Sequence, residues 1–153
     1  MGYNVTDIIE KAIKITIRRR TIYENIGREK CNDISFRTIS KFLVQEINKT
    51  IKYYELLLKE VKDVEFEEID FSIYDKMSFL INDFNNRINT VELNNGGEFW
   101  EYSLDLEKAV YSLLIDIQGR FVKNTSDIHT RTYKILTDMI ANKVNHIASL
   151  NKI

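Results

Sequence analysis

The sequence has 153 residues, of which 44% are hydrophobic and 29% charged, a composition typical of one globular domain spanning residues 1–153. Its 22 Lys and Arg residues nearly balance its 23 Asp and Glu residues, so no overall charge indicates a nucleic acid or a membrane surface as partner. No apolar run approaches the roughly 18 residues of a membrane span, the chain shows no signal-peptide pattern, and the lone Cys31 cannot form an intrachain disulfide, so we expect a cytoplasmic protein.

The first predicted element is a long helix from about Asp7 to about Lys30. Asp7 and Glu10 have the spacing of a helix cap. The absence of proline and the presence of only 5 glycines favour long helices over many short strands. One stripe of this helix carries residues at helical spacing: Val5, Ile9, Ala12, Thr16, Tyr23 and Ile26.

A second helix is predicted from about Ser35 to Lys62, after a turn at Asn32-Asp33. Its stripe consists of Ile39, Phe42, Leu43, Glu46, Tyr53 and Leu57. The acidic stretch from Asp63 to Asp70 indicates a solvated connection. The segment Phe71–Val91 again shows helical spacing, so we expect an extra helix in the crossover to the second half of the chain.

The strongest break in the chain is Asn94-Asn95-Gly96-Gly97. The helix predicted after it runs from about Glu98 to Val122, with this stripe: Trp100, Leu104, Glu107, Tyr111, Leu114, Gln118 and Phe121. A turn and N-cap at Asn124-Thr125-Ser126 precede a last helix from about Asp127 to the end. The last stripe consists of His129, Thr132, Leu136, Met139, Lys143, His146 and Leu150. Four long helices with such stripes predict an all-α four-helix bundle.

Each main helix also carries polar residues on its apolar stripe. They are Thr16 on the first, Glu46 and Lys49 on the second, Glu107 on the third, and Lys143 and His146 on the fourth. Because unpaired charges inside a bundle are unfavourable, these side chains are predicted to meet one another or a metal. Taken alone, each pair has a simpler explanation, either a surface ion pair or cations at a helix C-terminus. The prediction therefore depends on the joint pattern.

The order and spacing of these residues resemble the ferritin-like di-iron carboxylate proteins, especially the rubrerythrin-like branch. That family carries a Glu on the first and third helices and Glu-x-x-His on the second and fourth. Three ligand positions match in this chain, namely Glu46, Glu107 and His146. The resemblance covers most of the chain outside residues 63–95. It implies an up-down-down-up four-helix bundle with an extra helical crossover segment and, by analogy, a homodimer.

The other three ligand positions depart from the family pattern. Thr16 and Lys143 stand where the family has Glu, and Lys49 stands where it has His. A protonated lysine offers a metal no lone pair, so the resemblance implies a degenerate di-iron site. Glu46 and Glu107 would face Lys49 and Lys143, and these four charges sum to zero without any metal. We therefore expect the lysines to stand where the metal ions stood, in a non-catalytic structural or binding protein without a cofactor.

Two other functions stay open. Glu46, Glu107 and His146 could together hold one Fe, Mn or Zn ion, with water completing the coordination shell. If the chain is an enzyme, the resemblance implies a metal-dependent oxidoreductase. A complete di-iron centre would need further carboxylates such as Glu10 or Glu24, and the helical phase of these two argues against it.

The run Arg18-Arg19-Arg20 follows Thr16 on the first helix. It is too short to indicate nucleic-acid binding, and we interpret it as a solvated basic patch. Helical geometry spreads the three side chains around the axis, so one of them could instead point inward, near Glu46 or Glu107.

Overall fold

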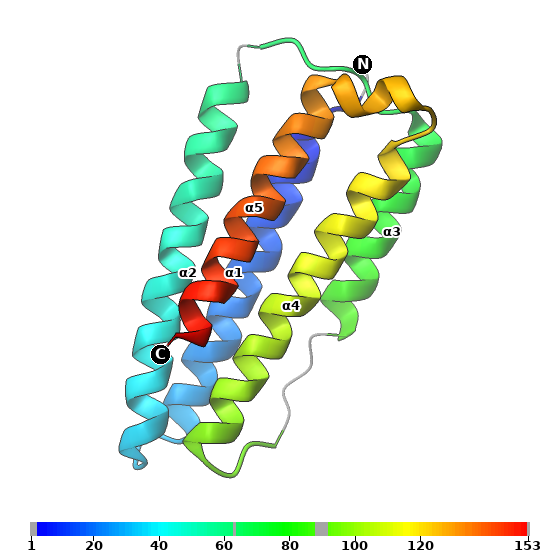
Figure 1. The fold of residues 1–153 in the computed structure, drawn as a ribbon. Coiled ribbons are helices and arrows are strands. Elements are labelled where there is room, and N and C mark those ends of the chain that lie inside the picture. Colours follow the sequence, from blue (N-terminus) through cyan, green and yellow to red (C-terminus); the bar gives the residue numbers. More distant parts are fainter. Residues whose placement is uncertain (1–2, 63, 88–91, 153) are drawn as a thin grey trace.

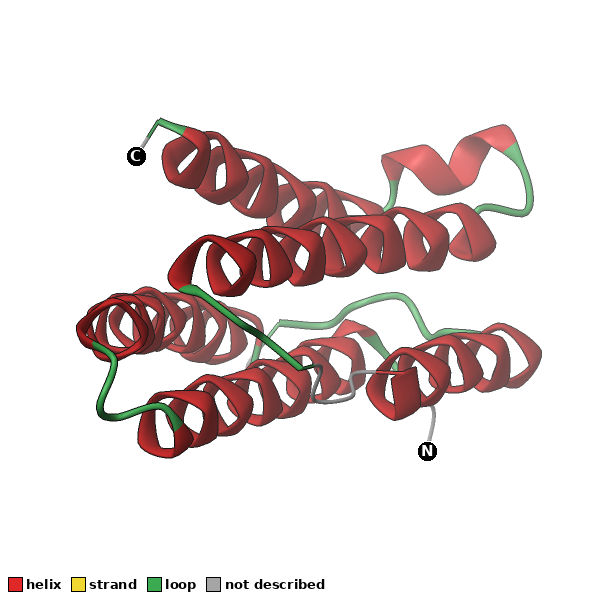
Figure 2. Cartoon of the chain, turned by 90° about the horizontal axis from the view of Figure 1, so that it is seen from below, coloured by secondary structure: helices red, strands yellow, loops and turns green. Residues whose placement is uncertain are grey.

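The computed structural model describes residues 3–62, 64–87 and 92–152. Its helices are α1 (Val5–Glu29), α2 (Ile34–Val61), α3 (Phe71–Arg87), α4 (Gly96–Phe121), the short 3-10 helix η1 (Thr125–His129) and α5 (Arg131–Asn151), labelled in part in Figure 1. Figure 2 shows helices joined by loops and no strand in the described part of the chain, where a single bridge links Tyr3 to Ile69. The all-helical prediction is confirmed.

The four longest helices lie alongside one another, and α3 lies beside α4 (Figure 1). From the end of the molecule where the N-terminus lies, α1 runs away and α2 returns. The crossover then leads to α3, which runs away from this end, after which α4 returns and α5 runs away. Thus α1 and α5 point one way, whereas α2 and α4 point the other. The extra helix predicted over Phe71–Val91 is present as α3, and residues 88–91 lie outside the described part.

The first and fourth α-helices begin earlier than predicted because asparagines cap them. Asn4 Oδ1 accepts a hydrogen bond from Thr6 N at 2.8 Å, and Asp7 Oδ2 accepts one from Asn4 N at 2.9 Å. Asp7 is therefore the third residue of α1 and completes a capping box, instead of starting the helix. Asn95 Oδ1 likewise accepts from Glu98 N at 2.9 Å, so α4 starts at Gly96.

The last helix begins later than predicted, at Arg131. Asn124 caps the 3-10 helix η1, so His129 belongs to η1 and not to the stripe of α5. Glu67 in the crossover accepts hydrogen bonds from Thr132 N at 2.9 Å and from Thr132 Oγ1 at 3.1 Å. These bonds satisfy a free amide at the start of α5. The acidic crossover, predicted as a solvated connection, therefore also caps the last helix.

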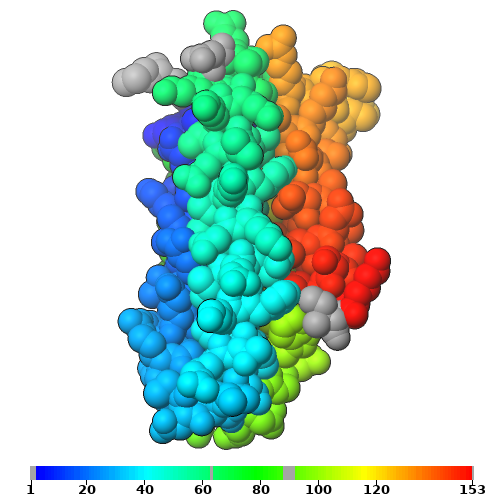
Figure 3. Space-filling model, turned by 90° about the vertical axis from the view of Figure 1, so that its left-hand side faces the viewer, coloured from blue at the N-terminus to red at the C-terminus, as the bar shows by residue number. Residues whose placement is uncertain are grey.

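The buried face of α2 lies beside the predicted stripe. Its buried residues are Phe36, Ser40, Leu43, Ile47, Thr50, Ile51, Tyr54, Leu57 and Val61. Ile39, Phe42 and Tyr53 of the predicted stripe lie next to this face and are half-buried. Figure 3 shows α2 with α1 on one side and α5 on the other, so apolar residues occupy more than one face of this helix.

An aromatic layer fills the bundle near the α1–α2 turn. Phe36 and Phe99 stack with ring centroids 5.6 Å apart, and Tyr23 lies 6.0 Å from Phe99. The three rings come from α1, α2 and α4 and are almost completely buried. Offset and tilted ring pairs of this kind stabilise a core beyond the area they bury. None of the described helices combines the length and apolar character that crossing a membrane requires.

Candidate functional site

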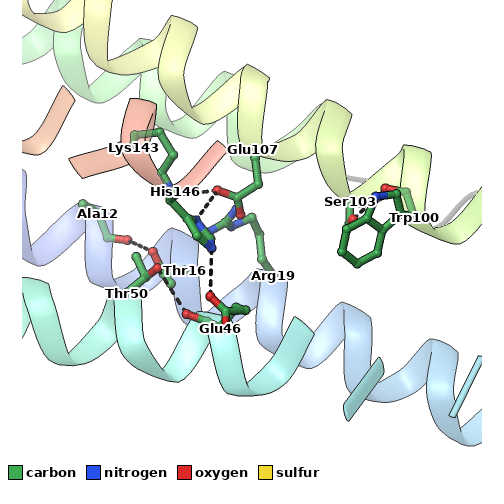
Figure 4. A network of polar contacts seen from close by, with 10 residues as sticks. All are labelled: Ala12, Thr16, Arg19, Glu46, Thr50, Trp100, Ser103, Glu107, Lys143 and His146. Carbon is green, nitrogen blue, oxygen red and sulfur yellow. Dashed lines mark hydrogen bonds and ion pairs between the residues drawn. The ribbon is translucent and has the colours of Figure 1, made fainter. Parts of the chain in front are cut away.

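A charged cluster lies inside the middle of the bundle, where α1, α4 and α5 face one another (Figure 4). Arg19, Glu107 and Lys143 are each at most 3% exposed, and we call them the buried triad. Lys143 Nζ donates to Glu107 Oε2 at 2.7 Å, and Arg19 Nη1 donates to Glu107 Oε1. Each oxygen of one carboxylate is therefore paired with a different cation.

Arg19 belongs to the run Arg18-Arg19-Arg20, which we interpreted as a solvated patch, with one inward-pointing side chain as the less favoured alternative. Ile15 and Tyr23, four residues before and after it, are both buried on α1, and residues four apart share a face of a helix. This spacing was a signal that Arg19 points inward while its neighbours do not. Arg20 lies on another face, where its Nη1 donates to Asn48 Oδ1 at 2.8 Å.

His146 extends the cluster from Glu107 towards the surface of α2. Its Nδ1 lies 3.3 Å from Glu107 Oε2, and its Nε2 lies 3.4 Å from Glu46 Oε2. The side chains of His146 and Glu46 are 14% and 17% exposed, so the cluster approaches solvent at Glu46. A neutral imidazole has one N–H and can serve one of these carboxylates, whereas an imidazolium can serve both.

Lys49 lies outside the cluster, contrary to the prediction that it points inward. Its Nζ lies 2.9 Å from Glu46 Oε1, but its side chain is 74% exposed. Lys49 lies on the solvent-facing side of α2, so Glu46 and Lys49 have the geometry of a surface ion pair at i,i+3 spacing. The second buried cation is instead Arg19. Thr16, at another predicted position, is buried and donates to Ala12 O of its own helix at 2.8 Å.

The triad contains two cations and one carboxylate, and their pKa values reflect this imbalance. Burial alone would raise the pKa of Glu107, but Arg19 and Lys143 hold it well below its usual range. Burial lowers the pKa of Lys143 to about 8, because desolvation and the nearby Arg19 outweigh the attraction of Glu107. Burial opposes the charge of Arg19 too, yet Glu107 leaves the pKa of Arg19 raised. At neutral pH the triad therefore carries a net positive charge.

Two buried tyrosines lie within the electrostatic influence of Arg19. Burial raises the pKa of Tyr54 to about 12 and also raises the pKa of Tyr23, while the Arg19 cation opposes both shifts. Within the described part of the chain, Tyr23 Oη and the Nε and Nη2 atoms of Arg19 have no hydrogen-bond partner. Unsatisfied donors of this kind are unfavourable, so the cluster contributes less stability than its ion pairs suggest.

The candidate metal ligands Glu46, Glu107 and His146 are brought together in one chain of contacts. His146 lies between the two carboxylates and presents a different nitrogen to each of them. Among the residues that the structure describes, no three His, Cys, Asp or Glu side chains are arranged so that they could hold a metal ion. Neither ring nitrogen of His146 has a hydrogen-bond partner among these described residues, so the arrangement is a row of close contacts and not a set of converging ligands.

Comparisons with known proteins add no relative. No family model matches the chain, and neither a curated protein nor a solved structure shows significant similarity to it.

Proposed function

We propose that this chain is a non-catalytic protein of the ferritin-like kind, in which a cluster of charged side chains replaces the di-iron centre and the bundle has a structural or binding role. The observation that carries the proposal is that both oxygens of Glu107 are paired with buried cations, Arg19 and Lys143. In a metal site the bound ions would supply this positive charge. Here the protein supplies it from α1 and α5, so the carboxylate is compensated without metal.

The directions of the helices support the proposal. Among the four longest helices, α1 and α5 run one way and α2 and α4 the other, and the crossover between α2 and α4 contains α3 (Figure 1). Two halves joined by one long crossover are the connectivity of ferritin-like folds. A homodimer and a cytoplasmic location accompany the proposal by analogy with that family alone.

Electrostatic repulsion from the two cations of the triad would disfavour a metal ion beside Glu107. A divalent ion beside Glu107 would have to displace Arg19 or Lys143 from the carboxylate oxygens. The displaced cation would then remain buried without a counter-charge, close to a doubly charged ion. We therefore expect weak metal binding at this position and no metal-dependent oxidation chemistry.

The first test is the metal content of protein purified without added metal, which should be far below one ion per chain. The second is a restored variant, Thr16→Glu, Arg19→Gln and Lys143→Glu, which replaces the buried non-ligand side chains and should gain iron binding. The matched control, Arg19→Gln with Lys143→Gln, removes both cations without adding a ligand and should not gain it. Two irons per chain in the unmodified protein would contradict the proposal. A restored variant that folds but binds no iron would show that these are not the family's ligand positions.

A second candidate function is a single Fe, Mn or Zn site at Glu46, Glu107 and His146. The observation that favours it is the position of His146, which lies within 3.4 Å of a carboxylate oxygen from each of the two glutamates. Binding would require both carboxylates to turn to one side of the imidazole, since ligands must converge on the metal. One ion per chain, lost in His146→Ala but retained in His129→Ala, would establish this candidate. The exposed His129 on η1 is a suitable control because it lies outside the cluster.

A further inference from the structure

A groove on the outside of the α1–α2 hairpin is lined by three basic side chains. Arg28 comes from α1, and Arg37 and Lys41 come from α2, where they are four residues apart and share a face. The groove has a volume of about 380 Å³. We call it the basic groove. It is separate from the buried triad, which lies inside the bundle.

The close approach of two helices forms the floor of the basic groove. At Gly27, which lines the groove, a Cβ atom would collide with Ser40 Oγ, so α1 and α2 can approach this closely only with glycine here. Ser40 is buried, and its Oγ donates to Tyr23 O at 2.9 Å. The floor is therefore fixed by the fold, while the charged side chains around it are exposed.

The positive charge of the basic groove is only partly compensated. Within the described residues, Arg28, Arg37 and Lys41 form no ion pair, and Arg28 donates to the neutral side chain of Asn25. Glu24 also lines the groove and brings its net charge to two positive charges. The wider segment Lys11–Lys41 has nine Lys and Arg residues and three Asp and Glu residues, although the whole chain is nearly balanced. The field around the groove therefore attracts anions.

We propose that the basic groove binds the phosphate group of a small phosphorylated molecule. A phosphate monoester near neutral pH carries close to two negative charges, which matches the net charge of the groove. An arginine guanidinium can donate two parallel hydrogen bonds to phosphate oxygens, and Arg28 and Arg37 both line the groove. Lys41 adds a third cation, one turn after Arg37 on α2. The volume is that of a site for a small ligand.

The charge distribution favours a small ligand over an extended nucleic acid. Outside the segment Lys11–Lys41 the chain contains 13 Lys and Arg residues against 20 Asp and Glu residues, so the remainder of the molecule is acidic. A long polyanion needs a continuous basic surface, whereas one phosphate group needs only the groove.

Calorimetric titration with inorganic pyrophosphate at physiological salt tests the proposal. The unmodified protein should bind one pyrophosphate saturably, and Arg37→Gln with Lys41→Gln should weaken binding at least about tenfold, because two charge-assisted hydrogen-bonding groups are lost. Lys108→Gln with Lys134→Gln removes the same charge from exposed positions on α4 and α5 and should leave binding unchanged. Circular dichroism of both variants should show the unmodified helix content.

Three outcomes would overturn the proposal. One is the lack of saturable pyrophosphate binding up to millimolar concentration, and another is an equal loss of binding in the two variants. The third is binding of phosphatidic acid vesicles through Arg37 and Lys41 without binding of pyrophosphate, which would assign the groove to a lipid surface. None of these results depends on the metal content of the bundle, so this test and that of the proposed function fail independently.

Discussion

The aromatic layer and the buried triad are equally hidden from solvent, yet they stabilise the bundle in different ways. The rings of Phe36 and Phe99 need only contacts of suitable shape. The triad residues need partners of opposite charge in fixed positions, because their desolvation offsets much of the Coulomb attraction. Truncating an aromatic ring leaves a cavity, whereas truncating Glu107 leaves two buried cations without a counter-charge. Burial alone therefore does not show how much a residue contributes.

The change Glu107→Gln should have the largest effect, because it leaves Arg19 and Lys143 buried together without a negative partner. We expect a loss of about 3–5 kcal/mol in the free energy of unfolding, measured by urea denaturation. Glu101→Gln on the exposed side of the same helix is the control and should change stability by less than about 0.5 kcal/mol. A loss below about 1 kcal/mol for Glu107→Gln would show that the carboxylate does not compensate the two cations.

The change Phe99→Ala tests the aromatic layer and should reduce stability by about 3 kcal/mol through the cavity that it leaves. Unlike the loss in Glu107→Gln, this loss should be the same at every pH, because no titrating group in the triad changes its partners. The measurement is the free energy of unfolding of Phe99→Ala and of the unmodified protein between about pH 5 and about pH 9. A loss that varied with pH would mean that the two regions are coupled.

The pH dependence of stability should reveal Lys143 by itself. Its pKa is about 8 in the folded protein, below its ordinary value of 10.5, so the unfolded chain binds more protons between these two pH values. The contribution of Lys143 to the free energy of unfolding should therefore rise with pH across this window, by about 1–3 kcal/mol. The difference in stability between the unmodified protein and Lys143→Met should show this rise, and a difference that is flat from pH 7 to about 10 would refute it.

The smallest net effect should come from replacing the whole triad with apolar residues. In Arg19→Met, Glu107→Leu and Lys143→Met combined, no buried charge is left alone, so stability should stay within about 1 kcal/mol of the unmodified value or rise. The comparison with Glu107→Gln separates the contribution of the ion pairs from the penalty of breaking them. A combined loss as large as that of Glu107→Gln would mean that the ion pairs themselves stabilise the fold strongly.

The helices could be predicted from the sequence because their apolar stripes follow the helical period and no proline interrupts them. Burial of Glu107 and Lys143 followed from the same stripes. The pairing of Arg19 with Glu107 could not be predicted, since the two residues are 88 positions apart. The local sequence pattern does not determine which faces of α1 and α4 pack together. The inward placement of Lys49 failed for a related reason. The predicted stripe of α2 was displaced from its buried face, and Lys49 was assigned from its spacing to Glu46.

The origin of the triad in three different helices has a consequence for their alignment along the bundle axis. Sliding α5 by one turn, about 5.4 Å, would separate Lys143 from Glu107, while many apolar contacts could be replaced by equivalent ones one turn away. We expect every misaligned packing to be disfavoured by the free-energy cost of burying a charge without a partner. The triad therefore specifies one axial register of the helices among several packings that bury a similar apolar area.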